Sequence, residues 1–240
     1  PDHQTVIKIN DINWELISYP ILIKPSLSLE GKKGVFRANN KSELISSFSQ
    51  IKKFAFDGKI EIQEYIDGKD IGLIAMLHKG ILIPISIVDE INTFNKKGYL
   101  KACGMAIPTI QSNEIKKKVV SFTEKIVQTF NLNDSSSPFL ASFRYSNDGR
   151  LLPIEIHLDL GGDLIIEELL PNSMNFNFID FALKIMTDDK YQKPSILPKC
   201  IAILLNNQKQ NKNKINYNIH FEKNRHDLEK IIFKHIKKFK

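Results

Sequence analysis

Hydrophobic and polar residues alternate in several short runs of the chain, as expected for strands with one buried face. Residues 19–26, YPILIKPS, form one β-prone run, and residues 59–68, KIEIQEYIDG, alternate and end at a glycine. Residues 71–77 and 81–88 are strongly apolar and are joined by the three residues 78–80. A connection of this length containing glycine predicts a β-hairpin.

The second half of the chain contains further strand patterns. Residues 137–145, SPFLASFRY, and residues 150–158, RLLPIEIHL, flank an Asp-Gly turn signal at Asp148 and Gly149. A late strand is predicted within residues 193–205. Residues 89–109 show little periodicity, and we predict no regular element there.

Helical spacing of apolar residues marks the remaining elements. Ser42 and Ser112 are predicted to cap two helices, a third helix is predicted over residues 177–186, and a fourth over residues 227–239. The apolar stripes are Leu44, Phe48, Ile51 and Phe54 in the first helix, Ile115, Val119, Phe122, Ile126 and Phe130 in the second, and Leu228, Ile232 and Phe239 in the last. Strands and helices mix without strict alternation, so the predicted fold class is α+β.

Composition excludes several classes of protein. Of the 240 residues, 42% are hydrophobic and 25% are charged, which is typical of a globular chain with one large or two small domains. No apolar run approaches the roughly 20 residues of a membrane span, and the start lacks a signal-peptide pattern. Cys103 and Cys200 lie far apart, so we expect free thiols in a cytoplasmic protein. A chain that begins with Pro1 is expected to be a fragment.

The net charge of +7 is a property of the C-terminal part. From Leu183 onward there are 14 Lys and Arg against 5 Asp and Glu, a balance of +9, whereas the preceding part has 20 against 22, a balance of −2. Residues 206–214 form a polar low-complexity linker. Without interleaved aromatic residues, a solvated tail is the favoured interpretation and a nucleic-acid partner is not expected. Binding of an anionic surface beyond residue 205 is the alternative.

Lys24 ends an apolar strand and is followed by a loop that contains Gly31, Lys33 and Gly34. A lysine on a rigid strand beside glycines suits polyphosphate, because glycine lets backbone N–H groups approach the phosphate oxygens. An exposed lysine and a basic surface turn are the alternative.

Gln63, Glu64, Tyr65 and Ile66 lead from a strand into a turn, with Asp70 shortly after. Backbone groups at such a place can bind an adenine edge, and a nearby carboxylate can accept both ribose hydroxyls. A half-buried edge strand followed by a turn is the alternative.

Glu155, His157 and Asp159 would share one face of a strand that reads as interior. A carboxylate beside a second polar ligand can hold Mg²⁺ against a phosphate, because Mg²⁺ takes few protein ligands and keeps waters. A locally bonded core histidine is the alternative for His157, whereas an unpaired buried Glu155 would be costly.

In their joint order, these segments resemble the ATP-grasp family of carboxylate–amine ligases over Tyr19–Asp163. The family's P-x-x-x-K-P strand corresponds to Pro20–Pro25, and its G-x-x-G-V flap to Gly31–Val35. Its E-x-Y-I-x-G-x-E hinge corresponds to Gln63–Asp70, and its E-x-N-x-R-x-G-G strand to Glu155–Gly162.

The resemblance implies ATP and Mg²⁺, or Mn²⁺, as cofactors. Lys24 would contact phosphates, the loop over residues 27–34 would cover them, Asp70 would bind ribose, and Glu155 would bridge a metal to the triphosphate. The implied cofactor-binding residues are Lys24, Gly31, Lys33, Gly34, Gln63, Glu64, Tyr65, Ile66 and Asp70, the metal ligands are Glu155 and His157, and the candidate catalytic residues are Lys24 and Asp159.

The chain departs from the family pattern nearest the triphosphate. Ser142 stands where the family has a metal-binding carboxylate, His157 replaces an asparagine and Asp159 replaces an arginine. Either the metal site is rebuilt, with Asp159 restoring a charge and His157 suiting Mn²⁺, or divalent affinity has fallen. We favour a rebuilt site.

The resemblance further implies two α+β subdomains with a nucleotide cleft between them. Residues 1–66 would form a small lid subdomain ending in the hinge, residues 67–190 the large subdomain with the metal strand, and residues 191–240 a basic extension. The family's preceding N-terminal domain is expected to be absent. The expected partners are small carboxylate and amine substrates, together with a second copy of the chain or that missing domain. We expect an enzyme that joins a small carboxylate or amino acid to an amine through an acyl phosphate, with a silent nucleotide-binding regulatory or scaffold module as the alternative.

Overall fold

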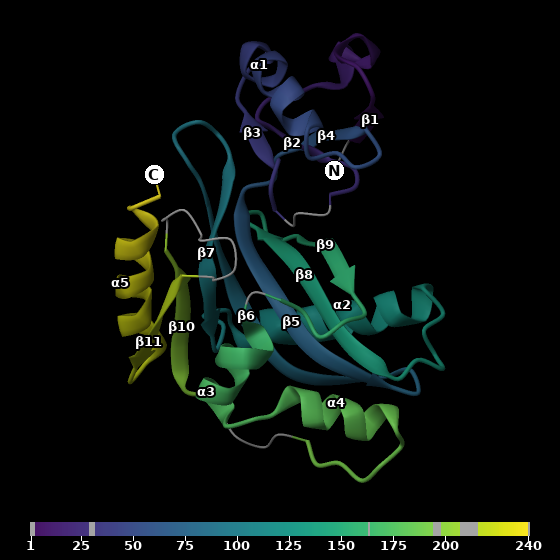
Figure 1. Cartoon of the computed structure of the whole chain (residues 1–240), viewed down its shortest axis with the longest axis vertical. Coiled ribbons are helices and arrows are strands. Elements are labelled where there is room, and N and C mark those ends of the chain that lie inside the picture. The colour runs from purple at the N-terminus through teal and green to yellow at the C-terminus, as the bar shows by residue number, and fades with distance from the viewer. Residues whose placement is uncertain (1–2, 29–31, 163, 194–197, 207–215, 240) are drawn as a thin grey trace. The chain divides into compact units, whose positions relative to one another are not determined.

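The computed structural model divides the chain into two compact units (Figure 1). The first unit holds residues 1–67, 92–102 and 236–240, and the second holds residues 68–91 and 103–235. The residues that the structure describes are 3–28, 32–162, 164–193, 198–206 and 216–239. The lid, hinge and metal-strand roles expected for the segments stay predictions.

The first unit contains a four-stranded antiparallel sheet in the order β1-β4-β2-β3. The predicted strands at 19–26 and 59–68 therefore lie side by side. The elements are β1 (His3–Val6), two 3₁₀ turns (Ile9–Asp11 and Trp14–Leu16), β2 (Ile21–Pro25), β3 (Phe36–Ala38), α1 (Lys41–Lys52) and β4 (Ile60–Glu64).

Helix α1 packs its predicted stripe against this sheet, because Leu44, Phe48 and Ile51 are all buried in one core cluster with the strands. The predicted cap at Ser42 is wrong. Asn40 has extended backbone and its side chain accepts a hydrogen bond of 2.9 Å from the Glu43 backbone N–H. Asn and Ser are comparable caps, so the sequence alone did not separate two candidates that lie two residues apart.

The second unit contains a seven-stranded sheet in the order β11-β10-β7-β6-β5-β8-β9. The predicted hairpins over residues 71–88 and 137–158 are confirmed as the pairs β5–β6 and β8–β9. The elements are β5 (Gly68–His78), β6 (Ile81–Phe94), β7 (Leu100–Ile107), α2 (Asn113–Thr129), β8 (Ser137–Ser146), β9 (Leu151–His157), a π-helical turn η3 (Ile165–Leu169), α3 (Leu170–Met174), α4 (Phe178–Met186), β10 (Cys200–Leu205), β11 (Tyr217–Glu222) and α5 (Arg225–Ile236).

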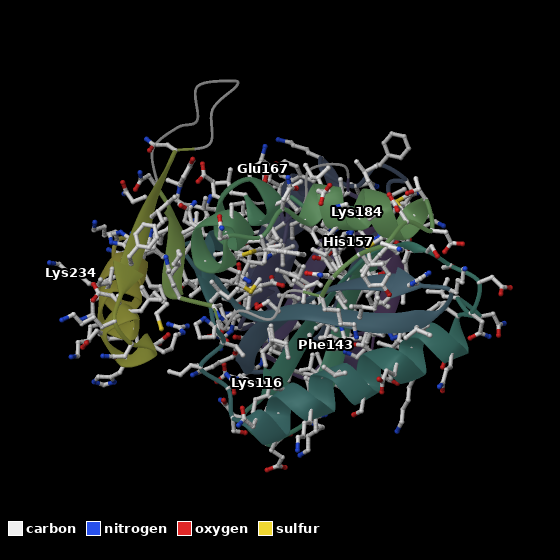
Figure 2. All side chains as sticks on the ribbon, turned by 90° about the horizontal axis from the view of Figure 1, so that it is seen from below. Lys116, Phe143, His157, Glu167, Lys184 and Lys234 are labelled. Carbon is white, nitrogen blue, oxygen red and sulfur yellow. The ribbon has the colours of Figure 1, made fainter. Side chains whose placement is uncertain are left out.

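Helices cover both faces of this sheet. Alternate residues of a strand point to opposite faces, so Leu73 and Phe143 pack in the cluster with α2, whereas Ile74 and Leu140 pack in the cluster with η3, α3 and α4. Figure 2 shows α2 on one side of the strands together with Phe143, and α4 on the other side together with His157. We call the second side the α4 face.

The C-terminal segment is built into the same unit. β10 pairs with β7 and with β11, and Arg225 at the start of α5 attaches the helix to the sheet. Its guanidinium donates from Nη2 to Asp89 Oδ2 at 2.6 Å and from Nε to the Pro108 carbonyl at 2.9 Å. Thr109 Oγ1 donates to the other Asp89 oxygen at 2.5 Å, and Glu229 lies 2.6 Å from Arg225 Nη1.

Three expectations about regular structure are wrong. Residues 89–109 are largely β-strand, since β6 runs on to Phe94 and β7 follows. Small residues hide β7 from a pattern search; Gly104 has φ +143 and an added Cβ would lie 2.0 Å from the Ile203 carbonyl oxygen. β11 was not predicted, and Phe130, the last member of the predicted α2 stripe, is 65% exposed. The predicted linker falls almost entirely on residues 207–215, outside the described residues.

Candidate functional site

The α4 face of the sheet ends in a polar group of residues on β5, β6 and β8. Asp70 on β5 lies opposite Arg144 on β8, and the pair is joined twice, from Nε to Oδ1 at 2.6 Å and from Nη2 to Oδ2 at 3.1 Å. The side chains are 6% and 19% exposed. The structure thus places the predicted ribose-binding acid in a buried ion pair that engages both of its oxygens.

Glu155, His157 and Asp159 lie together at β9, the edge strand of the sheet. His157 Nε2 is 3.5 Å from Glu155 Oε2, and His157 Nδ1 is 3.9 Å from Asp159 Oδ2. Their expected interior position is wrong, because the three side chains are 47%, 45% and 64% exposed. The apolar run around them reads as interior in sequence, but an edge strand borders only one neighbour and its side chains are only partly covered.

Ser142 lies directly opposite Glu155 in the β8–β9 pairing. Its hydroxyl donates a hydrogen bond of 2.5 Å to Glu90 Oε1 on β6. Glu90 was not singled out in the sequence, because it lies in the stretch where no strand was predicted. Counting the hairpin register would have found it, since Glu90 is the β6 partner of Asp70.

Lys24 lies on β2 in the first unit, opposite Glu61 on β4. The Lys24 ammonium is 3.1 Å from Glu61 Oε2, and the two side chains are 30% and 28% exposed. The predicted phosphate-binding lysine is therefore half-buried and held by a carboxylate on the neighbouring strand. Glu61 was not identified in the sequence, although a lysine and a glutamate on paired strands are a known stabilising combination.

The predicted adenine-binding residues follow β4. Gln63 lies opposite residues of both β1 and β2, so its backbone faces two strands, and the Tyr65 N–H donates to the Pro20 carbonyl at 3.2 Å. The Arg37 guanidinium lies 4.3 Å from the centre of the Tyr65 ring. Glu64 is exposed and Ile66 is half-buried. Backbone contacts with a ligand are therefore easiest beyond Gln63.

The glycine loop is described only in part, because Gly31 lies outside the described residues. Lys33 is exposed. Gly34 has φ +81, and an added Cβ would lie 3.0 Å from both Phe54 and Pro25. Both the backbone conformation and the lack of space therefore require glycine at position 34, whatever the loop binds.

A groove of about 760 Å³ lies beside α4 and contains none of the predicted site residues. Phe176, Phe181 and Tyr191 supply its aromatic wall, with Lys184 and Lys190 among its charged residues. Within the described parts of the chain, no group of three or more His, Cys, Asp or Glu residues is arranged to hold a metal. None of the helices described has the length and apolar character needed to cross a membrane.

Comparisons with known proteins place this geometry in a family. The model of the ATP-grasp domain matches residues 17–167, more than half of the chain. The D-alanine–D-alanine ligase of Thermosipho africanus (strain TCF52B) is 25% identical over 152 residues, which cover 60% of this chain and 39% of that protein. The chain thus spans well under half the length of this curated relative.

Solved structures agree with the fold. The L-amino acid ligase of Bacillus licheniformis superposes with a TM-score of 0.67 at 19% identity, over 85% of this chain and 48% of its own. N5-carboxyaminoimidazole synthetase of Staphylococcus aureus, complexed with ADP, superposes with a TM-score of 0.73 at 13% identity, over 97% of this chain and 66% of its own. With the family match over residues 17–167, the chain belongs to the ATP-grasp family.

Proposed function

We propose that the chain is the nucleotide-binding part of an ATP-dependent ligase that joins a small carboxylate, such as an amino acid, to an amine. Family membership supports ATP-dependent ligase chemistry in general. The names of two relatives, a D-alanine–D-alanine ligase and an L-amino acid ligase, support amino acids as substrates. The observation that carries the proposal is the half-exposed Glu155 beside His157 on the edge strand.

The proposed reaction has two steps. A carboxylate oxygen of the substrate attacks the γ-phosphorus of ATP, the bond from the γ-phosphorus to the β–γ bridging oxygen breaks, and ADP leaves. The amine then attacks the acyl carbon, phosphate leaves with the bonding electrons, and the nitrogen loses a proton to solvent. Such chemistry depends mainly on positioning and charge neutralisation.

The predicted residues take the following parts. Lys24 would bind phosphate oxygens, with Lys33, Gly31 and Gly34 covering them. Glu64, Tyr65 and Ile66 would contact adenine, with Gln63 before them, and Asp70 would bind ribose. Asp159 would add negative charge beside the metal ligands. These roles rest on the resemblance and on the positions described above.

The donor set on β9 fits a divalent cation. A carboxylate and an imidazole on one exposed strand leave room for waters and phosphate oxygens, which Mg²⁺ and Mn²⁺ require. Glu155 and His157 would hold the ion, which when bound supplies charge neutralisation to the triphosphate. Two protein ligands suffice, because Mg²⁺ usually binds through one or two carboxylates plus substrate phosphates.

Substitution of Glu155 by Gln tests the proposal. We expect Glu155→Gln to abolish ATP-dependent phosphate release, measured across candidate amino acids with Mg²⁺ or Mn²⁺, while the circular dichroism spectrum is unchanged. Glu167→Gln removes an equal charge from an exposed turn and serves as the control with full activity. Unchanged turnover in Glu155→Gln would rule out the metal assignment.

A silent nucleotide-binding module is the second candidate function. Ser142 in place of a carboxylate and the engagement of both Asp70 oxygens by Arg144 favour it. Isothermal titration with ATP and Mn²⁺, beside the phosphate-release assay, separates the two functions. Binding without phosphate release for any substrate would support the silent module.

A further inference from the structure

Glu90 reaches across a neighbouring strand on the α4 face. Its backbone pairs with Asp70, one step along β5 from Gly72 on the same face. A Cβ added at Gly72 would lie 3.3 Å from Glu90 Oε1 and 3.9 Å from Glu90 Cγ. The missing side chain at position 72 therefore leaves the space that the Glu90 carboxylate occupies, above β5 and toward β8.

The Glu90 carboxylate ends at the strand that faces the proposed metal ligand. Glu90 Oε1 accepts the hydrogen bond of 2.5 Å from Ser142 Oγ, and Ser142 lies directly opposite Glu155. Residues opposite each other on paired strands have Cβ atoms about 5 Å apart and point to the same face. Glu90, Ser142 and Glu155 thus form one continuous row across β6, β8 and β9, with Gly72 beneath it.

This row solves a problem of charge at the proposed site. A serine hydroxyl at position 142 brings no negative charge to a divalent cation, whereas hard cations prefer carboxylate oxygens. We propose that Glu90 supplies the second carboxylate of the metal site on Glu155, held in place by Ser142. The inference rests on the proposed function, because it assumes that a cation binds at Glu155.

Ser142 is a positioning residue in this arrangement. A hydroxyl that donates to one carboxylate oxygen keeps that group ionised and fixes its rotamer, while its other lone pairs and the second oxygen remain able to accept. The same hydroxyl lies beside Glu155 and can accept hydrogen bonds from metal-bound water. The arrangement moves the acid from β8 to β6 while keeping its charge next to β9.

The test measures Mn²⁺ itself. Mn²⁺ is titrated into the full chain with a non-hydrolysable ATP analogue, and free ion is counted by electron paramagnetic resonance. We expect Glu90→Gln to weaken nucleotide-dependent Mn²⁺ binding about tenfold or more, since one charge-assisted contact is lost. Glu167→Gln is the matched control and should bind like the parent chain.

A relocation variant separates this role from loss of folding. In Glu90→Gln/Ser142→Asp the missing carboxylate returns on β8, opposite Glu155, and we expect most of the Mn²⁺ affinity to return with it. Thermal melts followed by circular dichroism show that each variant is folded.

Parent-like Mn²⁺ binding by Glu90→Gln would overturn the inference and leave the proposed function standing. Failure of Ser142→Asp to restore binding in a folded double variant would likewise overturn it. If the parent chain binds the analogue but no Mn²⁺, or binds neither, the assumption of a cation at Glu155 fails and the inference falls with the proposed function.

Discussion

Two groups of charged residues in the second unit differ in how completely the protein occupies them. Arg225 is 12% exposed and bonds to Asp89, to Glu229 and to the Pro108 carbonyl. On β9, Glu155 and His157 are nearly half exposed and 3.5 Å apart. The first group has short bonds in a partly dry environment, and the second has a long contact in water.

The difference separates structural charge from charge available for binding. Removing a buried partner leaves an uncompensated charge, which is strongly destabilising, whereas an exposed pair contributes little to stability. Charges that contribute little to folding can be spared for a ligand. The comparison therefore predicts that variants near Arg225 affect stability, and variants near Glu155 affect binding.

The largest expected effect on stability comes from Arg225→Met. The substitution leaves Asp89 without its guanidinium, and we expect the free energy of unfolding to fall by about 3 kcal/mol. Urea denaturation followed by circular dichroism measures it. Glu155→Gln is the control and should change the same quantity by less than about 0.5 kcal/mol. Equal losses in the two variants would remove the distinction drawn here.

A smaller loss is expected from Arg144→Met. This pair on β5 and β8 is partly buried, and Asp70 would keep a carboxylate that is 6% exposed without its partner. We expect the free energy of unfolding to fall by about 2 kcal/mol. The double variant Arg144→Met/Asp70→Asn should recover part of the loss, since the unpaired charge is gone. A double variant less stable than Arg144→Met would contradict this account.

The smallest effect concerns Asp188 at the exposed end of α4. Its pKa lies below the ordinary value, first because Lys79 bonds to the carboxylate at 2.8 Å and then because His78 does so at 3.1 Å. A lowered pKa in the folded state stabilises above the unfolded pKa, and this contribution is lost as pH falls through the folded pKa. Carboxyl NMR titration should show the Asp188 midpoint rising in Lys79→Met. An unchanged midpoint would show that Lys79 has no influence.

Much of the fold could be predicted from local patterns. Long apolar runs gave the β5–β6 and β8–β9 hairpins, and Ser112 marked the start of α2, where its side chain accepts from the Ile115 N–H at 3.3 Å. The strand β7 could not be predicted this way. Its small residues are set by close approach of β10, a strand that lies about 100 residues further along the chain.

The candidate site was predicted only in its parts. The spacing of Glu155, His157 and Asp159 correctly placed them on one face, because side-chain period is a local property. Their exposure depends on β9 being an edge strand, which only the order of the sheet decides. Glu61 and Glu90 depend on register between strands, and a single sequence carries little information about register.

The order β11-β10-β7 has a practical consequence for anyone shortening this protein. A version that stops near residue 190 would strip the outer two strands from the sheet and leave β7 as a bare rim with unpaired backbone groups. Ile107 and Ala106 on β7, which are fully buried in the intact chain, lie in register with β10. Such rims recruit other chains, so the truncated protein should precipitate rather than behave as a smaller enzyme.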